Sequence, residues 1–434
     1  MSKMNGINGI SMDRMKVCVI GAGAAGLCAA RHLAANKRFV FEMYERTDKV
    51  GGTWNYTDNI GVDENGFPIH SSMYKHLRTN LPMEIMAFAD YPWQRQKNSF
   101  VKHDVVLEYL KDYTKHFDLN RHIKFYHSVI SVKRSANEWE VTVKDVKANR
   151  LFTKTFDAIC VCNGRYSMPG IPETLKEDMK KTKIKIIHSH DYRESKQFMN
   201  ENVFILGAGP SGIDICLEIA EVAKNVYLCH HLNEQFLDLP RNITQINSPI
   251  ASIGVKAVKM KNGTEIELDS IVFATGYNYD FTFLDSSCDI KVTKSGRVLH
   301  TYLHLINIAH PSMAIWAIPQ KILPFPLYNQ QVIFFLKSLL KEFTLPSKEA
   351  MLDSEESDFC KRTEKGIAER HAHKMFEPFL WELDDQMCSL ANMTPISPTV
   401  RQIFDHLHEL RKQYTSGYKD MNLIINNNNG FAFR

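Results

Sequence analysis

Apolar and glycine residues follow a regular order near the start of the chain. Residues 16–20 form a short apolar run that ends at glycine, the pattern of a buried parallel strand. Residues 21–26 are rich in glycine, and the Ala- and Leu-rich segment after them favours a helix to about Asn36. Residues 39–45 have the pattern of the next strand. We therefore predict one strand–turn–helix–strand unit.

The same order of segments returns in the middle of the chain. A strand, a glycine turn, a helix and a second strand are predicted at residues 203–206, 207–212, 213–223 and 226–229. The two turns lie 186 residues apart, from Gly21 to Gly207. This distance excludes a solenoid repeat and predicts two separate copies of one folding unit.

The segments between the two copies predict further elements. Residues 102–117 carry apolar side chains at the spacing of an amphipathic helix. Three apolar runs at residues 123–132, 138–146 and 151–156 predict a small β-meander, and residues 158–162 predict another buried strand. Pro169 and Pro172 interrupt regular structure, so we place a domain crossover near residue 170.

A matching crossover is predicted near Tyr277, after a strand at residues 270–274. The fold class is therefore α/β, with two Rossmann-like dinucleotide-binding domains. The larger domain is discontinuous, carries the β-meander and comprises residues 1–170 and 278–434. The smaller one, residues 171–277, is inserted between its halves.

The composition is that of an ordinary globular protein. The 434 residues are 44% hydrophobic and 24% charged, with a formal net charge of +4. Basic residues are scattered, so we expect no nucleic-acid partner. No run approaches 18 apolar residues and residues 1–15 lack the apolar core of a signal peptide, so we expect a soluble, cytoplasmic protein with no membrane span.

The nine cysteines favour a reducing compartment. Their number is odd and none form a C-x-x-C pair. Cys160 and Cys162 point to one face of a strand, where core packing is favoured over a metal ligand. The 18 histidines show no H-E-x-x-H or comparable spacing, so we expect no metal site.

Both glycine turns match the G-x-G-x-x-G fingerprint of dinucleotide-binding sites. In each, the first glycine permits a tight turn, the second lets a pyrophosphate approach the backbone, and the third lets helix pack on strand. The helix N-terminus presents free N–H groups and a positive dipole end to the phosphates. The candidate binding residues are Gly21, Gly23 and Gly26 in the first turn and Gly207, Gly209, Ser211 and Gly212 in the second.

The two copies differ at the end of their second strand. Glu45 lies 19 residues after Gly26, where a carboxylate accepts hydrogen bonds from an unphosphorylated ribose such as that of FAD. At the same distance from Gly212 stands His231. No carboxylate is there to repel a 2′-phosphate, so we predict FAD at the first site and NADP(H) at the second.

Three further motifs make the chain resemble the flavin-containing monooxygenases, from about residue 17 to residue 328. Residues Gly51, Gly52, Thr53 and Trp54 resemble the family's Gly-Gly-x-Trp segment beside the flavin. Thr79 and Asn80 resemble its Thr-Asn pair at the reacting face of the ring, and Ala274, Thr275, Gly276 and Tyr277 its linker between domains. Insect members, including alkaloid N-oxygenases, are more similar than the membrane-anchored vertebrate ones.

One family pattern is only partly kept. The family's F-x-G-x-x-x-H-x-x-x-[FY] segment retains His188 and Tyr192, but Thr182 and Ile184 replace its first two fixed residues. This departure concerns the geometry of a loop and leaves the cofactor assignments as they are.

The resemblance implies a two-stage reaction. NADPH reduces FAD, O2 adds at flavin carbon 4a, and the resulting hydroperoxide transfers its distal oxygen to a soft nucleophile. The expected substrates are tertiary amines, including alkaloids or other xenobiotics, and sulfides. Asn80 would donate a hydrogen bond near the reacting oxygen, which makes it the candidate catalytic residue. Whether the chain forms a homo-oligomer stays open.

Three other functions use similar dinucleotide-binding sites. A disulfide reductase would need a redox-active cysteine pair beside the flavin, which the sequence lacks. A Baeyer–Villiger or N-hydroxylating monooxygenase differs only in substrate. A non-enzymatic flavin or nucleotide sensor would not need Gly51–Trp54 or Asn80.

Selectivity for NADPH has two competing explanations. If His231 binds the 2′-phosphate, the preference over NADH is modest and falls between roughly pH 6 and 9, since histidine is charged only near or below its ordinary pKa of about 6.5. If instead Arg193 or Arg241 binds the phosphate, the preference stays nearly constant with pH, because arginine is always charged.

Overall fold

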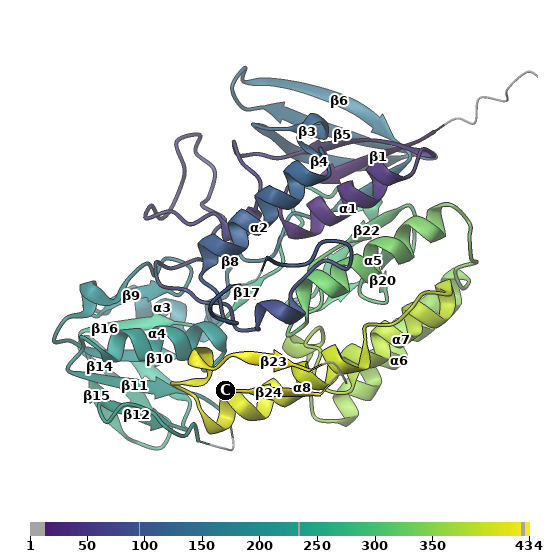
Figure 1. Ribbon diagram of the computed structural model, residues 1–434. Coiled ribbons are helices and arrows are strands. Elements are labelled where there is room, and N and C mark those ends of the chain that lie inside the picture. Colours follow the sequence, from purple (N-terminus) through teal and green to yellow (C-terminus); the bar gives the residue numbers. More distant parts are fainter. Residues whose placement is uncertain (1–13, 95, 233–234, 427–429) are drawn as a thin grey trace, which may run out of the picture.

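Two parallel sheets lie at opposite ends of the molecule, and a group of helices lies beside them (Figure 1). The computed structural model describes residues 14–94, 96–232, 235–426 and 430–434. None of the helices within these ranges has the length and apolarity that crossing a bilayer needs. The expected absence of a signal peptide concerns residues that lie mostly outside the described ranges.

The first sheet has seven strands in the order β20-β21-β22-β7-β1-β2-β3. All neighbouring pairs are parallel except the two that involve β21. Helix α1 (Ala24–Ala35) connects β1 to β2, as the sequence pattern predicted. The strands are β1 (Met15–Ile20), β2 (Phe39–Tyr44), β3 (Ile123–Lys124), β7 (Ala158–Val161), β20 (Thr301–Tyr302), β21 (Ile306–Asn307) and β22 (Met313–Ile315).

The second sheet has five strands, all parallel, in the order β12-β11-β10-β16-β9. Helix α4 (Pro210–Ala220) connects β10 to β11 and begins three residues before the predicted position, since proline is well suited to a first helical turn. The strands are β9 (Lys185–His188), β10 (Asn202–Leu206), β11 (Asn225–Cys229), β12 (Ile243–Ile246) and β16 (Ser270–Phe273). The predicted α/β fold class with two Rossmann-like units is confirmed.

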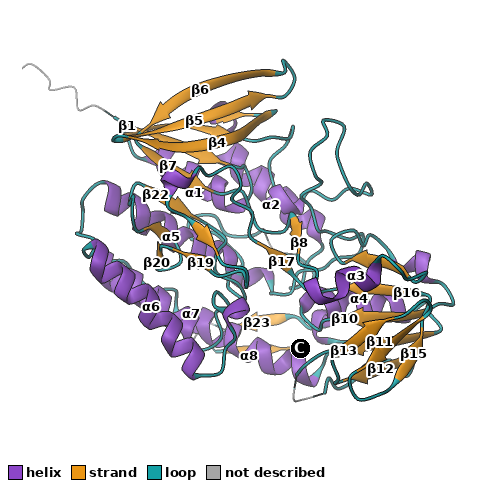
Figure 2. Ribbon diagram, turned by 180° about the vertical axis from the view of Figure 1, so that it is seen from behind, coloured by secondary structure: helices purple, strands orange, loops and turns teal. Residues whose placement is uncertain are grey.

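A three-stranded antiparallel sheet covers one face of the first parallel sheet (Figure 2). It consists of β4 (His127–Ser135), β5 (Glu138–Asp145) and β6 (Arg150–Phe156). The predicted first strand began at residue 123, which is wrong because Ile123 and Lys124 pair with β2 in the main sheet. A similar small sheet of β13 (Ile250–Ile253), β14 (Ala257–Met260) and β15 (Glu265–Glu267) packs on the second unit.

Two short antiparallel strands mark the places where the chain crosses between the units. Strand β8 (Met168–Pro169) pairs with β17 (Tyr277–Asn278). The Gly170 N–H also donates to the Gly276 carbonyl at 2.8 Å. The two connections are thus held side by side between the sheets.

Helices of the C-terminal part share one large apolar core with α1 and the first sheet. The remaining helices and strands are α2 (His103–His116), α3 (Lys176–Met179), α5 (Pro324–Leu339), α6 (Lys348–Glu364), α7 (Phe379–Ala391), α8 (Pro398–Gln413), β18 (Lys291–Val292), β19 (Val298–Leu299), β23 (Leu423–Ile425) and β24 (Phe431–Phe433). The final strands return between α8 and the second unit (Figure 1).

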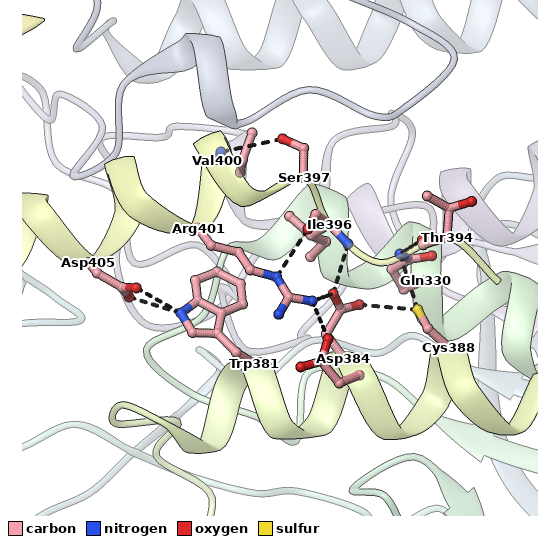
Figure 3. A network of polar contacts seen from close by, with 11 residues as sticks. Gln330, Trp381, Asp384, Cys388, Thr394, Ile396, Ser397, Val400, Arg401 and Asp405 are labelled. Atoms are coloured by element: carbon pink, nitrogen blue, oxygen red, sulfur yellow. Dashed lines mark hydrogen bonds and ion pairs between the residues drawn. The ribbon is translucent and has the colours of Figure 1, made fainter. Parts of the chain in front are cut away.

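A polar network fixes α8 against α7 (Figure 3). One guanidinium nitrogen of Arg401 donates to Asp384 and Asp385, at 2.6 Å each. Asp384 is fully buried and also accepts from the Ile396 N–H at 2.8 Å. Because a buried carboxylate is costly without partners, this arrangement constrains the position of α8 strongly.

Candidate functional site

The outer glycines of both turns are required by the packing of the protein itself. Gly21 has a φ of +97°, and a Cβ there would lie 2.6 Å from the Cys162 carbonyl oxygen. A Cβ at Gly26 would lie 1.9 Å from the Gly21 oxygen. In the second turn, a Cβ at Gly207 would lie 2.5 Å from the Ala274 carbonyl oxygen, and one at Gly212 would lie 2.0 Å from the Gly207 oxygen. These four glycines allow a tight turn and close packing of helix on strand.

The middle glycines, Gly23 and Gly209, are not explained by packing. Their φ values of −78° and −74° suit any residue. A Cβ at Gly209 would meet no described atom within 4 Å, and one at Gly23 would only touch Gly52 at 3.5 Å. Both are helix N-caps without a side-chain capping bond, so the N–H groups of the first helical turn are available. Bare backbone at a helix N-terminus with open space in front suits a phosphate group.

The segment Gly51–Trp54 packs directly against the first glycine turn. Gly52 has a φ of +55°, and a Cβ there would lie 2.9 Å from the Gly23 Cα. The Asn55 amide donates to the Val50 carbonyl at 2.9 Å, which holds the short 3-10 helix η1 (Gly52–Trp54) in place. Two motifs that the sequence placed in one site are therefore adjacent.

Glu45 directly follows β2 and lies next to the first glycine turn. Its side chain is 6% exposed and accepts hydrogen bonds from the N–H groups of Ala22 and Thr47, both at 2.9 Å. Oε1 also accepts from the Thr47 hydroxyl at 2.8 Å, whereas Oε2, which bonds the Ala22 N–H, has further acceptor capacity. The carboxylate is thereby fixed next to the glycine turn.

Two threonine hydroxyls near these motifs are buried and lack a hydrogen-bond partner among the described residues. They belong to Thr53 and Thr79. Thr79 as a whole is only 2% exposed. Buried polar atoms are rarely left without partners in folded proteins. Together with the open space at Gly23, these atoms fit a polar cofactor such as FAD.

Asn80 follows Thr79 and is held by the C-terminal part of the chain. Its Oδ1 accepts a hydrogen bond from the Tyr418 hydroxyl at 3.2 Å, and its main-chain carbonyl accepts one from Arg411. Its Nδ2 has no hydrogen-bond partner among the described residues. Sequence reasoning missed Arg411 and Tyr418, because nothing near them in the sequence indicates contact with a residue more than 300 positions earlier.

In the second unit, His231 is exposed while His230 turns inward. His230 bonds the Gln245 side chain at 3.2 Å. Ser211, in the first turn of α4, is also exposed. Arg193, the alternative ligand for the 2′-phosphate, already has hydrogen-bond partners within the protein. Its guanidinium donates to the carbonyls of His190, Tyr192 and Asn59.

Thr275 and Gly276 lie at the second crossover. The Thr275 hydroxyl donates to the Gly170 carbonyl at 2.5 Å, and Gly276 has a φ of +86°. Next to them, His188 packs edge-on against Tyr277 with ring centroids 5.3 Å apart, and burial lowers the pKa of His188 to about 4.

The departure from the family's histidine pattern has a structural explanation. Thr182 accepts from the Ile184 N–H at 3.1 Å, and Ile184 is buried in the core under the second small sheet. These two residues therefore shape the start of β9.

The cysteines form no disulfide. All nine are free, and eight are buried. Burial raises the pKa of Cys18, Cys160 and Cys162 above the ordinary value for a thiol. Within the described ranges, no three His, Cys, Asp or Glu residues are grouped to hold a metal ion.

Comparison with known proteins agrees with this geometry. The flavin-binding monooxygenase-like family matches residues 14–238 and 238–403. The chain belongs to this family. It is an FAD-dependent monooxygenase that uses NADPH and O2.

Relatives cover most of the chain. Flavin-containing monooxygenase FMO GS-OX-like 2 of Arabidopsis thaliana is 31% identical over 94% of this chain and 92% of its own length. Senecionine N-oxygenase of Tyria jacobaeae is 31% identical over 78% of this chain and 74% of its own length. The solved structure of S-allyl-L-cysteine S-oxygenase from Allium sativum is 30% identical in sequence and has a TM-score of 0.85. The match covers 94% of this chain and 95% of that one.

Proposed function

We propose that this monooxygenase transfers one oxygen atom of O2 to the nitrogen of tertiary amines or to the sulfur of sulfides. The buried hydroxyls of Thr53 and Thr79, which have no hydrogen-bond partner among the described residues, support this proposal, since a polar cofactor would provide partners for them. The printed names of an N-oxygenase and an S-oxygenase among the relatives support the substrate class.

The first site is proposed to hold FAD. Gly21, Gly23 and Gly26 would bind its pyrophosphate at the N-terminus of α1, and Glu45 would accept hydrogen bonds from its ribose. Gly52, Thr53, Trp54 and Thr79 would surround the ring system. When bound, FAD takes a hydride from NADPH and, with O2, supplies the electrophilic oxygen.

Asn80 is the proposed catalytic residue. Its Nδ2 would donate a hydrogen bond to the oxygen that is transferred, and it moves no proton itself. A preorganised donor of this kind stabilises charge that develops in the transition state.

The second site is proposed to hold NADP(H). Gly207, Gly209, Gly212 and Ser211 would bind the pyrophosphate, and the exposed His231 would face the 2′-phosphate. Thr275 and Gly276 would lie where the two cofactors meet, at the crossover between units. This assigns residues 1–170 and 278–434 to FAD and residues 171–277 to NADP(H).

A cytoplasmic location belongs to the same proposal. The free cysteines support it, since cysteines in the cytosol are normally kept reduced.

A substrate panel tests the proposed chemistry. Purified protein with FAD is given NADPH, air and one compound at a time: a tertiary amine, a dialkyl sulfide or a cyclic ketone. We expect N-oxide or S-oxide in proportion to the NADPH consumed, and no lactone. Lactone as the main product would replace this proposal by Baeyer–Villiger chemistry.

A further inference from the structure

The segment that follows α8 contacts both units of the molecule. Lys419 forms a buried ion pair with Asp214 on α4, and its ammonium also donates to the Arg78 carbonyl at 3.1 Å. Its neighbour Tyr418 is 6% exposed and bonds Asn80. One short 3-10 helix, η8 (Tyr418–Asp420), thus reaches the candidate catalytic residue and the second glycine unit at once.

Two hydrogen bonds from this cluster hold Asn80. Arg411 is a permanent cation that can only donate hydrogen bonds. It donates to the Asn80 main-chain oxygen, and its guanidinium lies 5.4 Å from the centre of the Tyr418 ring. The Tyr418 hydroxyl donates to the Asn80 Oδ1 at 3.2 Å.

This assignment fixes the orientation of the Asn80 amide. An asparagine amide can be turned over, which exchanges its donor and acceptor ends. With Oδ1 accepting from the Tyr418 hydroxyl, the Nδ2 end is left for other partners. Burial also raises the pKa of Tyr418 above its ordinary value, so the hydroxyl keeps its proton.

We propose that Arg411 and Tyr418 are positioning residues that aim the Asn80 Nδ2 at the reacting oxygen. They act through Asn80, whose main-chain oxygen and side-chain amide oxygen they hold. The inference rests on the proposed role of Asn80 and extends it to a second layer of residues from the far end of the chain.

The position of Arg411 depends on α8, which the Arg401–Asp384 network anchors at its other end (Figure 3). The Lys419–Asp214 pair anchors the following segment to α4. Because both ends are held, the Tyr418 ring has a fixed place next to Asn80.

A double-mutant cycle on Asn80 and Tyr418 tests the proposal. The enzyme with FAD is reduced with NADPH without oxygen and then mixed with air and no substrate, and the rate of H2O2 release is followed. This rate does not require the substrate to be known. Failure of the proposed function would appear separately, as wild-type protein that makes no N-oxide or S-oxide.

We expect Tyr418→Phe to raise the H2O2 release rate about fivefold, the effect of losing one orienting hydrogen bond. Asn80→Ala should raise it about a hundredfold, as for loss of one preorganised donor. The double variant should match Asn80→Ala alone, because Tyr418 acts only through Asn80. Tyr414→Phe, at a site 45% exposed, is the matched control and should behave as wild type.

Two results would overturn the proposal. One is a Tyr418→Phe variant that binds FAD, is reduced by NADPH at the wild-type rate and releases H2O2 at the wild-type rate. The other is a further fivefold increase when Tyr418→Phe is added to Asn80→Ala, since equal effects in both backgrounds mean that the two residues act independently.

Discussion

Gly23 and Gly209 differ from the other glycines of their turns in having no structural need to be glycine. Their backbone angles are ordinary, and a side chain at either would meet little or none of the described protein. A side chain would instead occupy the space proposed for a pyrophosphate. Substitution at these two positions therefore separates cofactor binding from folding.

We predict that Gly23→Val and Gly209→Val have reciprocal effects. Gly23→Val should fold but be largely colourless, because valine fills the space where FAD would approach α1. Gly209→Val should stay yellow, since the first site is intact, but should not be reduced by NADPH. Absorbance after purification measures the first effect, and anaerobic bleaching by NADPH measures the second.

Dithionite provides the control for this pair. It reduces a bound flavin directly, so it should bleach Gly209→Val at the wild-type rate. Normal FAD content in Gly23→Val would contradict the assignment of the first site. Normal reduction of Gly209→Val by NADPH would contradict that of the second.

Among the elements, α8 connects the fold to the site. Its start is fixed by the Arg401–Asp384 network (Figure 3). Its last turn carries Arg411, which donates to the Asn80 main-chain oxygen. Burial raises the pKa of Asp384, which indicates that its charge depends on the partners it has. Removing Arg401 leaves this carboxylate with the Ile396 N–H and the Cys388 thiol alone.

We predict that Arg401→Ala lowers the free energy of unfolding by about 3 kcal/mol, the typical effect of removing one member of a buried ion pair. Urea denaturation of the FAD-bound protein measures it. Lys361→Ala, an exposed position on α6, removes a cation without a buried partner and should change stability by less than about 0.5 kcal/mol. Equal stability of the two variants would show that the network does not hold α8.

At the level of elements, the sequence predicted most of what lies before residue 280. Buried strands and glycine turns produce local patterns, so β1, α1, β10 and α4 could be located within a few residues. Strand β3 was missed because two residues carry too little pattern to be separated from the meander that follows. The later helices could be assigned to the first domain but not placed individually.

At the level of the whole molecule, the parts of the site come from distant positions that share no local signal. The proposed roles of Glu45 and Gly23 follow from their spacing, because one supersecondary unit fixes both. Tyr418 was not, because its contact with Asn80 depends on how α8 and the last turn pack against the first unit. Side-chain contacts of this kind follow from tertiary packing, which a single sequence does not encode in any short segment.

The inward turn of His230 is a similar case. It precedes His231 in the chain, yet it is 3% exposed and its ring is hydrogen-bonded to the Gln245 side chain at 3.2 Å. Both histidines follow β11 directly, and only His231 is exposed.

The central claim is that this chain places one atom of O2 on a soft nucleophile at a site built around Asn80. The most direct measurement is turnover of NADPH and a dialkyl sulfide or tertiary amine under ¹⁸O2, with the product analysed by mass spectrometry. We predict an S-oxide or N-oxide carrying one ¹⁸O atom, in amounts close to the NADPH consumed. NADPH consumption that yields only H2O2 with every amine and sulfide offered, or product whose oxygen comes from water, would contradict the account.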